Sequence, residues 1–312
     1  MEHQFTYRIE AQEAGQTIEY FLKRRGYSRQ ILIQLKKTPD GILRNGIWAY
    51  TRDRLEACDK LTIRLVEKMS SEQIEPVLLP FGVVYEDTDL LVVNKPAKMS
   101  IHPSMNHHND TLANAVAAYA LKKGETYPYR CINRLDRDTT GLLILAKHML
   151  SAAILYEQMR ERKIQRTYLA LVKGRIEASG VLDLPIGRKP GSTIERIIDY
   201  EHGERAVTHY TPIRTGDNWT LLKCILETGR THQIRVHMSA IGHPLPGDFL
   251  YGPEDTEAER QLLHSFRLSF THPITKEPMV FTEPLPEDMK AYMNSDSKGD
   301  YLYEISDDTR EL

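Results

Sequence analysis

The residues of this chain best suited to chemistry are an aspartate and the arginines beside it. Arg134, Asp136 and Arg137 precede the short Thr-Thr-Gly segment 139–141, and the apolar run Leu142–Leu145 follows directly. Guanidinium neighbours favour the ionised carboxylate by charge pairing, and a buried strand after it would hold it rigidly. An ionised aspartate can act as a nucleophile or a general base toward a sugar or carbonyl centre. This stretch therefore predicts an active site.

Asp138 raises the alternative of a carboxylate pair, as found in glycosidases. Residues two apart in an extended segment point the same way, so Asp136 and Asp138 could share a face while Arg137 points away. This geometry allows a pair without requiring one, and nothing else in the sequence indicates a saccharide cleft. A glycoside hydrolase is therefore the weaker interpretation.

A tyrosine and a basic cluster form a second group of interest. Residues 151–163 have apolar residues at helical spacing, and Tyr168 follows at the start of an apolar, strand-like run. Cations at the end of this helix would complement its dipole, but their position just before the strand slightly favours a role in phosphate binding. The cluster consists of Arg160, Arg162, Lys163 and Arg166.

A second arginine-rich motif lies between residues 227 and 242. Thr231 predicts the cap of a helix with Ile234 and Met238 on one face, and Gly242 predicts its end. This places Arg230 just before a helix N-terminus. The same helix would make His232 and Arg235 face a common direction.

Composition and missing motifs narrow the classes of function. The 312 residues carry a net charge of −2, which argues against nucleic-acid binding by bulk charge but allows local basic patches. Three widely spaced cysteines predict neither a disulfide framework nor a zinc site. No glycine loop for phosphate, metal-ligand cluster or Gly-x-Ser-x-Gly motif is present. We expect a cytoplasmic monomer with no metal, no other cofactor and no membrane partner.

Changes in residue composition and clusters of turn residues divide the chain into three parts. We expect a small RNA-binding-like domain at 1–75, a catalytic domain at 81–293 and an acidic, disordered tail at 294–312. Within the first part, two predicted helices carry a basic face that includes Lys23, Arg24 and Arg25. A solvated surface and RNA contact are about equally good interpretations of this face.

Several motifs resemble the RluA-type RNA pseudouridine synthases, in the order that this family has them. Asn133 to Lys147, NRLDRDTTGLLILAK, resembles the family's catalytic motif. The other matching segments are LLVVNKPAKMSIHP from Leu90, RTYLALVKG from Arg166, PIGR from Pro185 and LETGRTHQIRVHMSAIGHPLPGD from Leu226. The N-terminal part is similar, less closely, to the small alpha-L RNA-binding domain that many members carry.

The resemblance implies a role for each residue of the site. Asp136 would be the catalytic aspartate, Tyr168 would stack on the flipped uracil, and Arg230 would pair with Asp136. Arg134 matches the arginine that fills the space left by the flipped nucleotide or touches the backbone beside it. Phosphate contacts would come from Arg160, Arg162, Lys163, Arg188 and Lys189. Leu142, Ile144 and Ile234 are candidate pocket walls, although ordinary core is an equally good interpretation.

One position departs from the family pattern. Asn133 stands where the family usually has histidine, and an asparagine cannot titrate near neutral pH. If the residue at this position transfers a proton, asparagine would abolish that step of catalysis. If the residue shapes the loop, asparagine suffices. We favour the second hypothesis.

The sequence as a whole predicts an α+β enzyme with a mixed, largely antiparallel central sheet flanked by helices. Its reaction would be uridine to pseudouridine in ribosomal or transfer RNA. The alternative is a non-catalytic RNA-binding or ribosome-assembly factor on the same fold.

Overall fold

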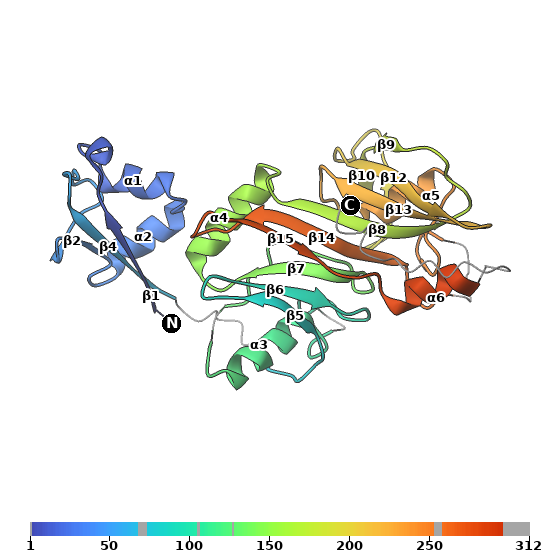
Figure 1. Ribbon diagram of the computed structural model, residues 1–312, viewed down its shortest axis with the longest axis horizontal. Coiled ribbons are helices and arrows are strands. Elements are labelled where there is room, and N and C mark those ends of the chain that lie inside the picture. The colour runs from blue at the N-terminus through green and yellow to red at the C-terminus, as the bar shows by residue number, and fades with distance from the viewer. Residues whose placement is uncertain (1, 68–73, 105–106, 127, 253–257, 296–312) are drawn as a thin grey trace.

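The computed structural model describes residues 2–67, 74–104, 107–126, 128–252 and 258–295, and Figure 1 shows the path of the chain through them. The segment expected to be a disordered tail, 294–312, lies outside the described residues from residue 296 onward. None of the helices in the described ranges is both long enough and apolar enough to cross a membrane. The boundaries at 75, 81 and 293 stay a prediction.

The N-terminal part folds as a small antiparallel sheet with two helices. The sheet has the order β1-β4-β2-β3, and a 3-10 turn at Ala11–Glu13 follows β1. The side chains of Thr17 and Ser28 cap the helices by accepting hydrogen bonds from backbone N–H groups. The elements are β1 (Glu2–Arg8), α1 (Ile18–Arg24), α2 (Arg29–Lys37), β2 (Ile42–Arg44), β3 (Ile47–Trp48) and β4 (Lys60–Val66).

A nine-stranded sheet is the main sheet of the part that follows. Its order is β5-β6-β7-β14-β8-β13-β12-β9, with β15 paired to β14. β14 runs parallel to β7 and antiparallel to β8 and β15, so the sheet is mixed and largely antiparallel, as predicted. The strands are β5 (Gly82–Glu86), β6 (Leu90–Lys95), β7 (Thr140–Ala146), β8 (Gln165–Lys173), β9 (Gly180–Asp183), β12 (Val207–Thr215), β13 (Trp219–Leu226), β14 (Leu263–Thr271) and β15 (Pro278–Thr282).

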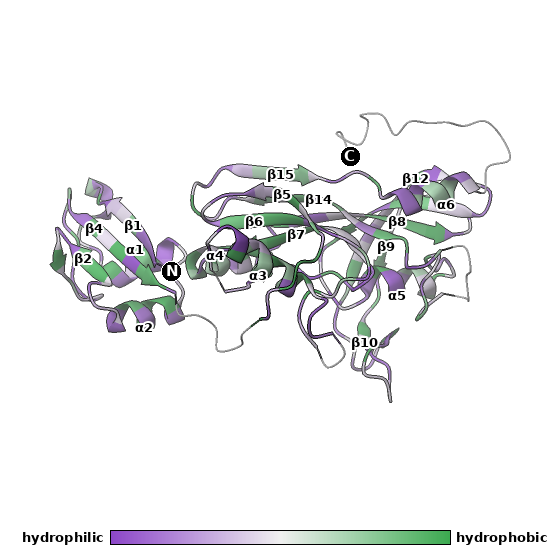
Figure 2. Ribbon diagram, turned by 90° about the horizontal axis from the view of Figure 1, so that it is seen from below, coloured by the Kyte–Doolittle hydropathy of each residue, from purple (hydrophilic) through white to green (hydrophobic). Residues whose placement is uncertain are grey.

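Four helices and one hairpin complete this part. Thr111 caps α3, and His232 is the N-cap of α5 in place of the expected Thr231. The hairpin of β10 and β11 projects from the body of the molecule in Figure 2. The bounds are α3 (Leu112–Lys122), α4 (Met149–Arg160), α5 (Gln233–Ala240), α6 (Glu287–Ser295), β10 (Ile186–Arg188) and β11 (Arg196–Ile198).

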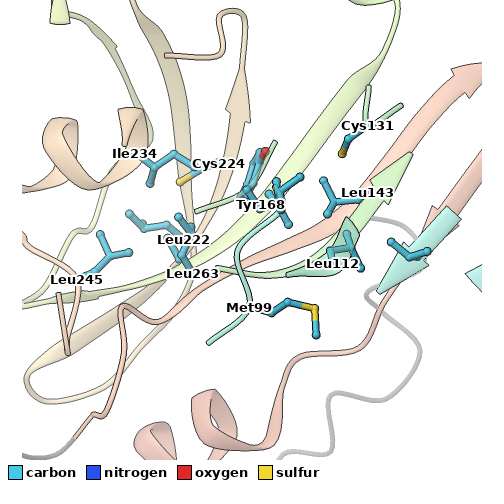
Figure 3. Packing of buried hydrophobic residues seen from close by; sticks show 14 of the residues in the cluster. Met99, Leu112, Cys131, Leu143, Tyr168, Leu222, Cys224, Ile234, Leu245 and Leu263 are labelled. Atoms are coloured by element: carbon cyan, nitrogen blue, oxygen red, sulfur yellow. The ribbon is translucent and has the colours of Figure 1, made fainter. Parts of the chain in front are cut away.

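Strand β8 separates two hydrophobic cores. Because side chains alternate along a strand, Tyr168 and Ala170 join the core that includes residues of α3 and α5, whereas Leu169 and Leu171 pack with α6. Figure 3 shows Tyr168 near Cys224 and near Ile234 of α5. The register of β8 therefore sets the face on which the candidate tyrosine lies.

The N-terminal part packs against α4. Leu150 and Ile154 of α4 belong to the same hydrophobic cluster as the buried residues of α1, α2 and β4. The carboxylate of Glu67 accepts hydrogen bonds from the guanidinium of Arg130 and the backbone N–H of Met149, both at 2.6 Å. In Figure 1 the two sheets accordingly lie on either side of α4.

Candidate active site

Asp136 lies in the turn that leads into β7. Leu135 beside it is buried, and the backbone oxygen of Asp136 accepts a hydrogen bond from the N–H of Thr139 at 3.1 Å. The turn ends at Gly141, whose φ is +107°. A Cβ at this position would lie 2.3 Å from the carbonyl oxygen of Ser265, so only glycine lets β7 approach β14 this closely.

A fully buried lysine ties this turn to the loop after β6. The Nζ atom of Lys95 donates hydrogen bonds to the backbone oxygens of Pro96, Met99 and Arg137 at 2.7, 2.9 and 2.8 Å. Burial lowers the pKa of Lys95 to about 7, although the carboxylates nearby favour its charged form. Lys95 thus holds the residue next to Asp136 in place, a role that we did not assign from the sequence.

Asn133 anchors the start of the same turn. Its side-chain oxygen accepts a hydrogen bond from the backbone N–H of Ile144 at 2.9 Å, and its amide nitrogen donates to the oxygen of Leu142 at 3.4 Å. The side chain is buried and bonded to the backbone of β7. This arrangement supports the hypothesis that position 133 shapes the loop.

The ion-pair partner of Asp136 is Arg235, and the expected pairing with Arg230 is wrong. The Nη1 atom of Arg235 lies 2.9 Å from Oδ2 of Asp136. Arg230 instead pairs with Glu204, and its Nε atom donates to the backbone oxygen of Arg205 at 3.1 Å. Arg230 precedes α5, whereas Arg235 lies inside the helix on the side that faces the Asp136 turn.

A second carboxylate holds Arg235 from another edge of the guanidinium. The Nε and Nη2 atoms of Arg235 donate to Asp248 at 2.7 and 2.8 Å. Burial alone would lower the pKa of Arg235, but the hydrogen bonds and charges of Asp248 and Asp136 outweigh it and raise this pKa. The guanidinium, 2% exposed, therefore stays charged and bridges two carboxylates.

Sequence reasoning missed Arg235 and Asp248 as site residues. A usable signal was present, because Arg235 lies between two apolar residues, Ile234 and Val236, in a helix. A charged side chain in such a position is buried only when it has a partner. The sequence offered no means of telling which aspartate would be that partner.

Tyr168 lines the cavity beside Asp136. The residue is 4% exposed, and burial raises the pKa of its hydroxyl group. Tyr168 therefore presents a neutral phenol to the cavity near pH 7, and only a small part of its surface reaches that cavity.

The cavity around these residues has a volume of about 860 Å³ and a strongly basic lining. Five arginines contribute to it, and three of these each have a carboxylate partner: Arg160 with Glu157, Arg162 with Glu227 and Arg230 with Glu204. Arg134 has no carboxylate partner within the described part of the chain and is exposed. The fifth, Arg166, donates to the backbone oxygen of Thr228 at 3.4 Å, and its buried Nε has no hydrogen-bond partner there.

The other basic residues expected to contact RNA lie farther out. Lys163 is exposed just beyond α4 and pairs with Glu161, and Arg188 is exposed on the projecting hairpin with Lys189 next to it. On α1, Lys23 pairs with Glu19. Arg24 is exposed, whereas Arg25 lies over the ring of Phe21 and pairs with Glu13.

The three residues expected as pocket walls belong to different cores. Ile234 lines the part of the cavity next to Asp136 and shares a core with Tyr168. Leu142 instead belongs, with Ile144, to a separate core that includes residues of β6, β15 and α4. Leu142 as a pocket wall is therefore wrong, because β7 alternates and presents Leu143 and Leu145 to the core of Tyr168.

One cluster in the described ranges has the composition of a metal site, namely Asp87, Asp89 and His272. The Nδ1 atom of His272 accepts hydrogen bonds from the backbone N–H groups of Ile274 and Thr275 at 3.2 and 3.0 Å. Its Nε2 must then carry the proton that it shares with Asp87 at 2.9 Å. The cluster is thus explained as a hydrogen-bond network, and it lies outside the residues that line the cavity.

We predict that Asp248→Asn destabilises the protein by about 3 kcal/mol, because Arg235 would keep a buried charge with one carboxylate partner fewer. Urea unfolding at neutral pH measures this change. The matched control is Asp183→Asn, which removes an exposed carboxylate from Arg205 and should cost less than about 1 kcal/mol. Equal losses from the two variants would contradict the importance of the buried pair.

Residues 89–240 match the protein family described as RNA pseudouridylate synthase. The uncharacterized RNA pseudouridine synthase YjbO of Bacillus subtilis is 38% identical over 282 residues, which cover 90% of this chain and 99% of that protein. Ribosomal large subunit pseudouridine synthase D of Nitrosomonas europaea is 40% identical over 238 residues, which cover 73% of this chain and 68% of that protein.

The fold has a similar counterpart among solved structures. Human RNA Pseudouridylate Synthase Domain Containing 1 has a TM-score of 0.56 and 28% identity to this protein, over 69% of this chain and 86% of that chain. A relative aligned over almost its whole length, a matching family and a shared fold lead to the same conclusion. The chain belongs to the RluA-type family of RNA pseudouridine synthases.

Proposed function

We propose that this enzyme isomerises uridine to pseudouridine in large-subunit ribosomal RNA, with Asp136 as its catalytic aspartate. The observation that carries the proposal is the carboxylate of Asp136, which is held by Arg235 and lines an arginine-rich cavity together with Tyr168. The name of the Nitrosomonas europaea relative supports the choice of RNA class.

The reaction is an internal rearrangement that balances without an added reactant. The bond between N1 of uracil and C1′ of ribose breaks, the base turns, and a bond forms between C5 and C1′. The proton leaves C5, and N1 gains one. The protein must therefore hold a detached base and a reactive ribose together while excluding water.

A base inside a helix cannot reach Asp136, so the nucleotide must leave the stack at a cost of about a few kcal/mol. Stacking on Tyr168 offsets part of this cost, because an aromatic ring accepts any base face. Arg134 supplies an exposed charge next to Asp136 that no carboxylate in the described residues engages. We assign Arg134 to the space left by the nucleotide or to the adjacent phosphate.

The alternative, a non-catalytic RNA-binding factor, rests on Asn133. The hydrogen bonds of Asn133 to the backbone of β7 give this residue a structural role that needs no titrating group. This observation favours a catalytic function over RNA binding alone. An assay of tritium release distinguishes the two functions.

We predict that Asp136→Asn abolishes tritium release from RNA labelled at C5 of uracil while RNA binding stays within about threefold, since the substitution removes the reactive charge and leaves the arginines of the cavity in place. Release from the unaltered protein is the positive result. Asp138→Asn is the control two residues away, and it should retain release. Release by Asp136→Asn would refute the catalytic assignment, and equal loss from Asp138→Asn would favour a carboxylate pair.

We predict that Arg235→Lys lowers kcat about 100-fold, because a lysine cannot bond Asp136 and the two oxygens of Asp248 at once. Arg230→Lys keeps a charge at the rim of the cavity and should change kcat less than about fivefold. Single-turnover rates at saturating enzyme measure both variants. The opposite ranking would restore Arg230 as the functional partner of Asp136.

We predict that deleting the gene removes at least one pseudouridine from large-subunit ribosomal RNA and none from transfer RNA. Chemical mapping of pseudouridines in RNA from cells with and without the gene measures this directly. A complementing copy that carries Asp136→Asn should not restore the missing site. Loss confined to transfer RNA would contradict the substrate class and leave the chemistry intact.

A further inference from the structure

The carboxylate of Asp136 has two oxygens in different surroundings. Arg235 engages Oδ2 at 2.9 Å, whereas Oδ1 faces the Nε2 atom of His232 at 3.8 Å. His232 lines the part of the cavity next to Asp136, and its side chain is 13% exposed. The residue is thus a second neighbour of the catalytic carboxylate, in addition to Arg235.

The backbone of His232 has an unusual conformation for a residue with a side chain. Its φ and ψ of 59° and 20° fall in the left-handed region, and its side chain makes no capping hydrogen bond although it is the N-cap of α5. Non-glycine residues persist in this region only when their surroundings hold them there, and such positions are common in functional sites.

Tyr251 contacts the nitrogen of His232 that faces away from Asp136. The oxygen of Tyr251 accepts a hydrogen bond from the backbone N–H of Arg196 at 2.8 Å and lies 2.7 Å from Nδ1 of His232. With one lone pair engaged by Arg196, the Tyr251 hydroxyl can donate its own proton to Nδ1, and in that arrangement Nε2 carries the hydrogen of the ring. The N–H of Nε2 then points toward Oδ1 of Asp136.

Burial is consistent with this neutral form, because it lowers the pKa of His232. Tyr251 also contacts the other partner of Asp136, since the guanidinium of Arg235 lies 5.0 Å from the centre of its ring. Its backbone N–H in turn donates to Asp248 at 3.2 Å. One tyrosine therefore supports both neighbours of Asp136.

We propose that His232 is a positioning residue that donates its Nε2–H to Oδ1 of Asp136 when RNA fills the cavity, and that Tyr251 fixes the required tautomer. The proposal rests on the proposed function of Asp136. An approach of about 1 Å converts the observed separation into a hydrogen bond, and catalytic hydrogen bonds are often long before substrate binds. Donors on both oxygens would fix the plane of the carboxylate relative to the ribose.

The experiment compares two replacements that differ in reach. Asparagine tolerates the left-handed backbone and can still bond Tyr251, but it is too short to reach Asp136. Glutamine places an amide N–H near the position of Nε2. Single-turnover rates and KM for the C5-tritiated RNA are measured with His232→Asn, His232→Gln and the control His202→Asn, whose side chain is 85% exposed.

We expect His232→Asn to lower the single-turnover rate about 30-fold with KM within about twofold, since a small misplacement of a reacting group lowers the rate far more than it weakens binding. His232→Gln should recover at least about fivefold of that loss, and His202→Asn should match the unaltered protein. If His232 had a purely structural role, asparagine would fulfil it as well as glutamine does. A faster rate with glutamine than with asparagine therefore indicates donation to Asp136.

Tyr251→Phe tests whether the tyrosine acts through His232. Tyr251→Phe should lower the single-turnover rate of the otherwise unaltered protein. It should change this rate less than about twofold when His232→Asn is already present, because Tyr251 acts through its hydrogen bond to His232. Full additivity would overturn the role of Tyr251. A His232→Asn enzyme as fast as the unaltered one, or no rescue by glutamine, would overturn the role of His232. An unaltered protein that releases no tritium would instead overturn the proposed function itself.

Discussion

The site depends on one buried guanidinium, that of Arg235, held between the carboxylates of Asp136 and Asp248. A buried charge that loses a partner destabilises a protein by about 3 to 5 kcal/mol, so none of the three groups moves freely. They come from α5, from the segment after it and from the turn before β7. The ion pair therefore joins α5 and the segment after it to a turn 99 residues before Arg235, and it gives Asp136 both its charge environment and its position.

Backbone packing supplies the rigidity that this ion pair requires. Gly141 lets β7 and β14 approach at the point where the Asp136 turn ends, and Lys95 binds three carbonyl oxygens around the same turn. Asn133 attaches the start of the turn to β7. Because these contacts involve backbone atoms, the turn keeps its shape largely independently of the side chains that face the cavity.

The basic residues of the cavity differ in how strongly the protein itself engages them. Arg160, Arg162 and Arg230 each have a glutamate partner, whereas Arg134 has none among the described residues. An arginine that already pairs with a carboxylate gains less from a phosphate, because the existing partner must first be displaced. The arginines of the cavity therefore differ in how readily they can bind a phosphate. Arg134 can do so without leaving a carboxylate partner, and it is the cavity arginine closest to Asp136 in sequence.

The sequence alone determined the mixed sheet with flanking helices, and Asp136 and Tyr168 as cavity residues, because hydrophobic period, turn residues and motif order are local features. It did not determine which arginine meets Asp136 or which face of β7 lines the cavity, and the expectations for Arg230 and Leu142 were wrong. The arginine that contacts Asp136 depends on where α5 packs, and the face of β7 that lines the cavity depends on strand register. Both are fixed only when segments distant in sequence pack together. The placement of His232 beside Oδ1 and of Asp248 behind Arg235 was decided in the same way.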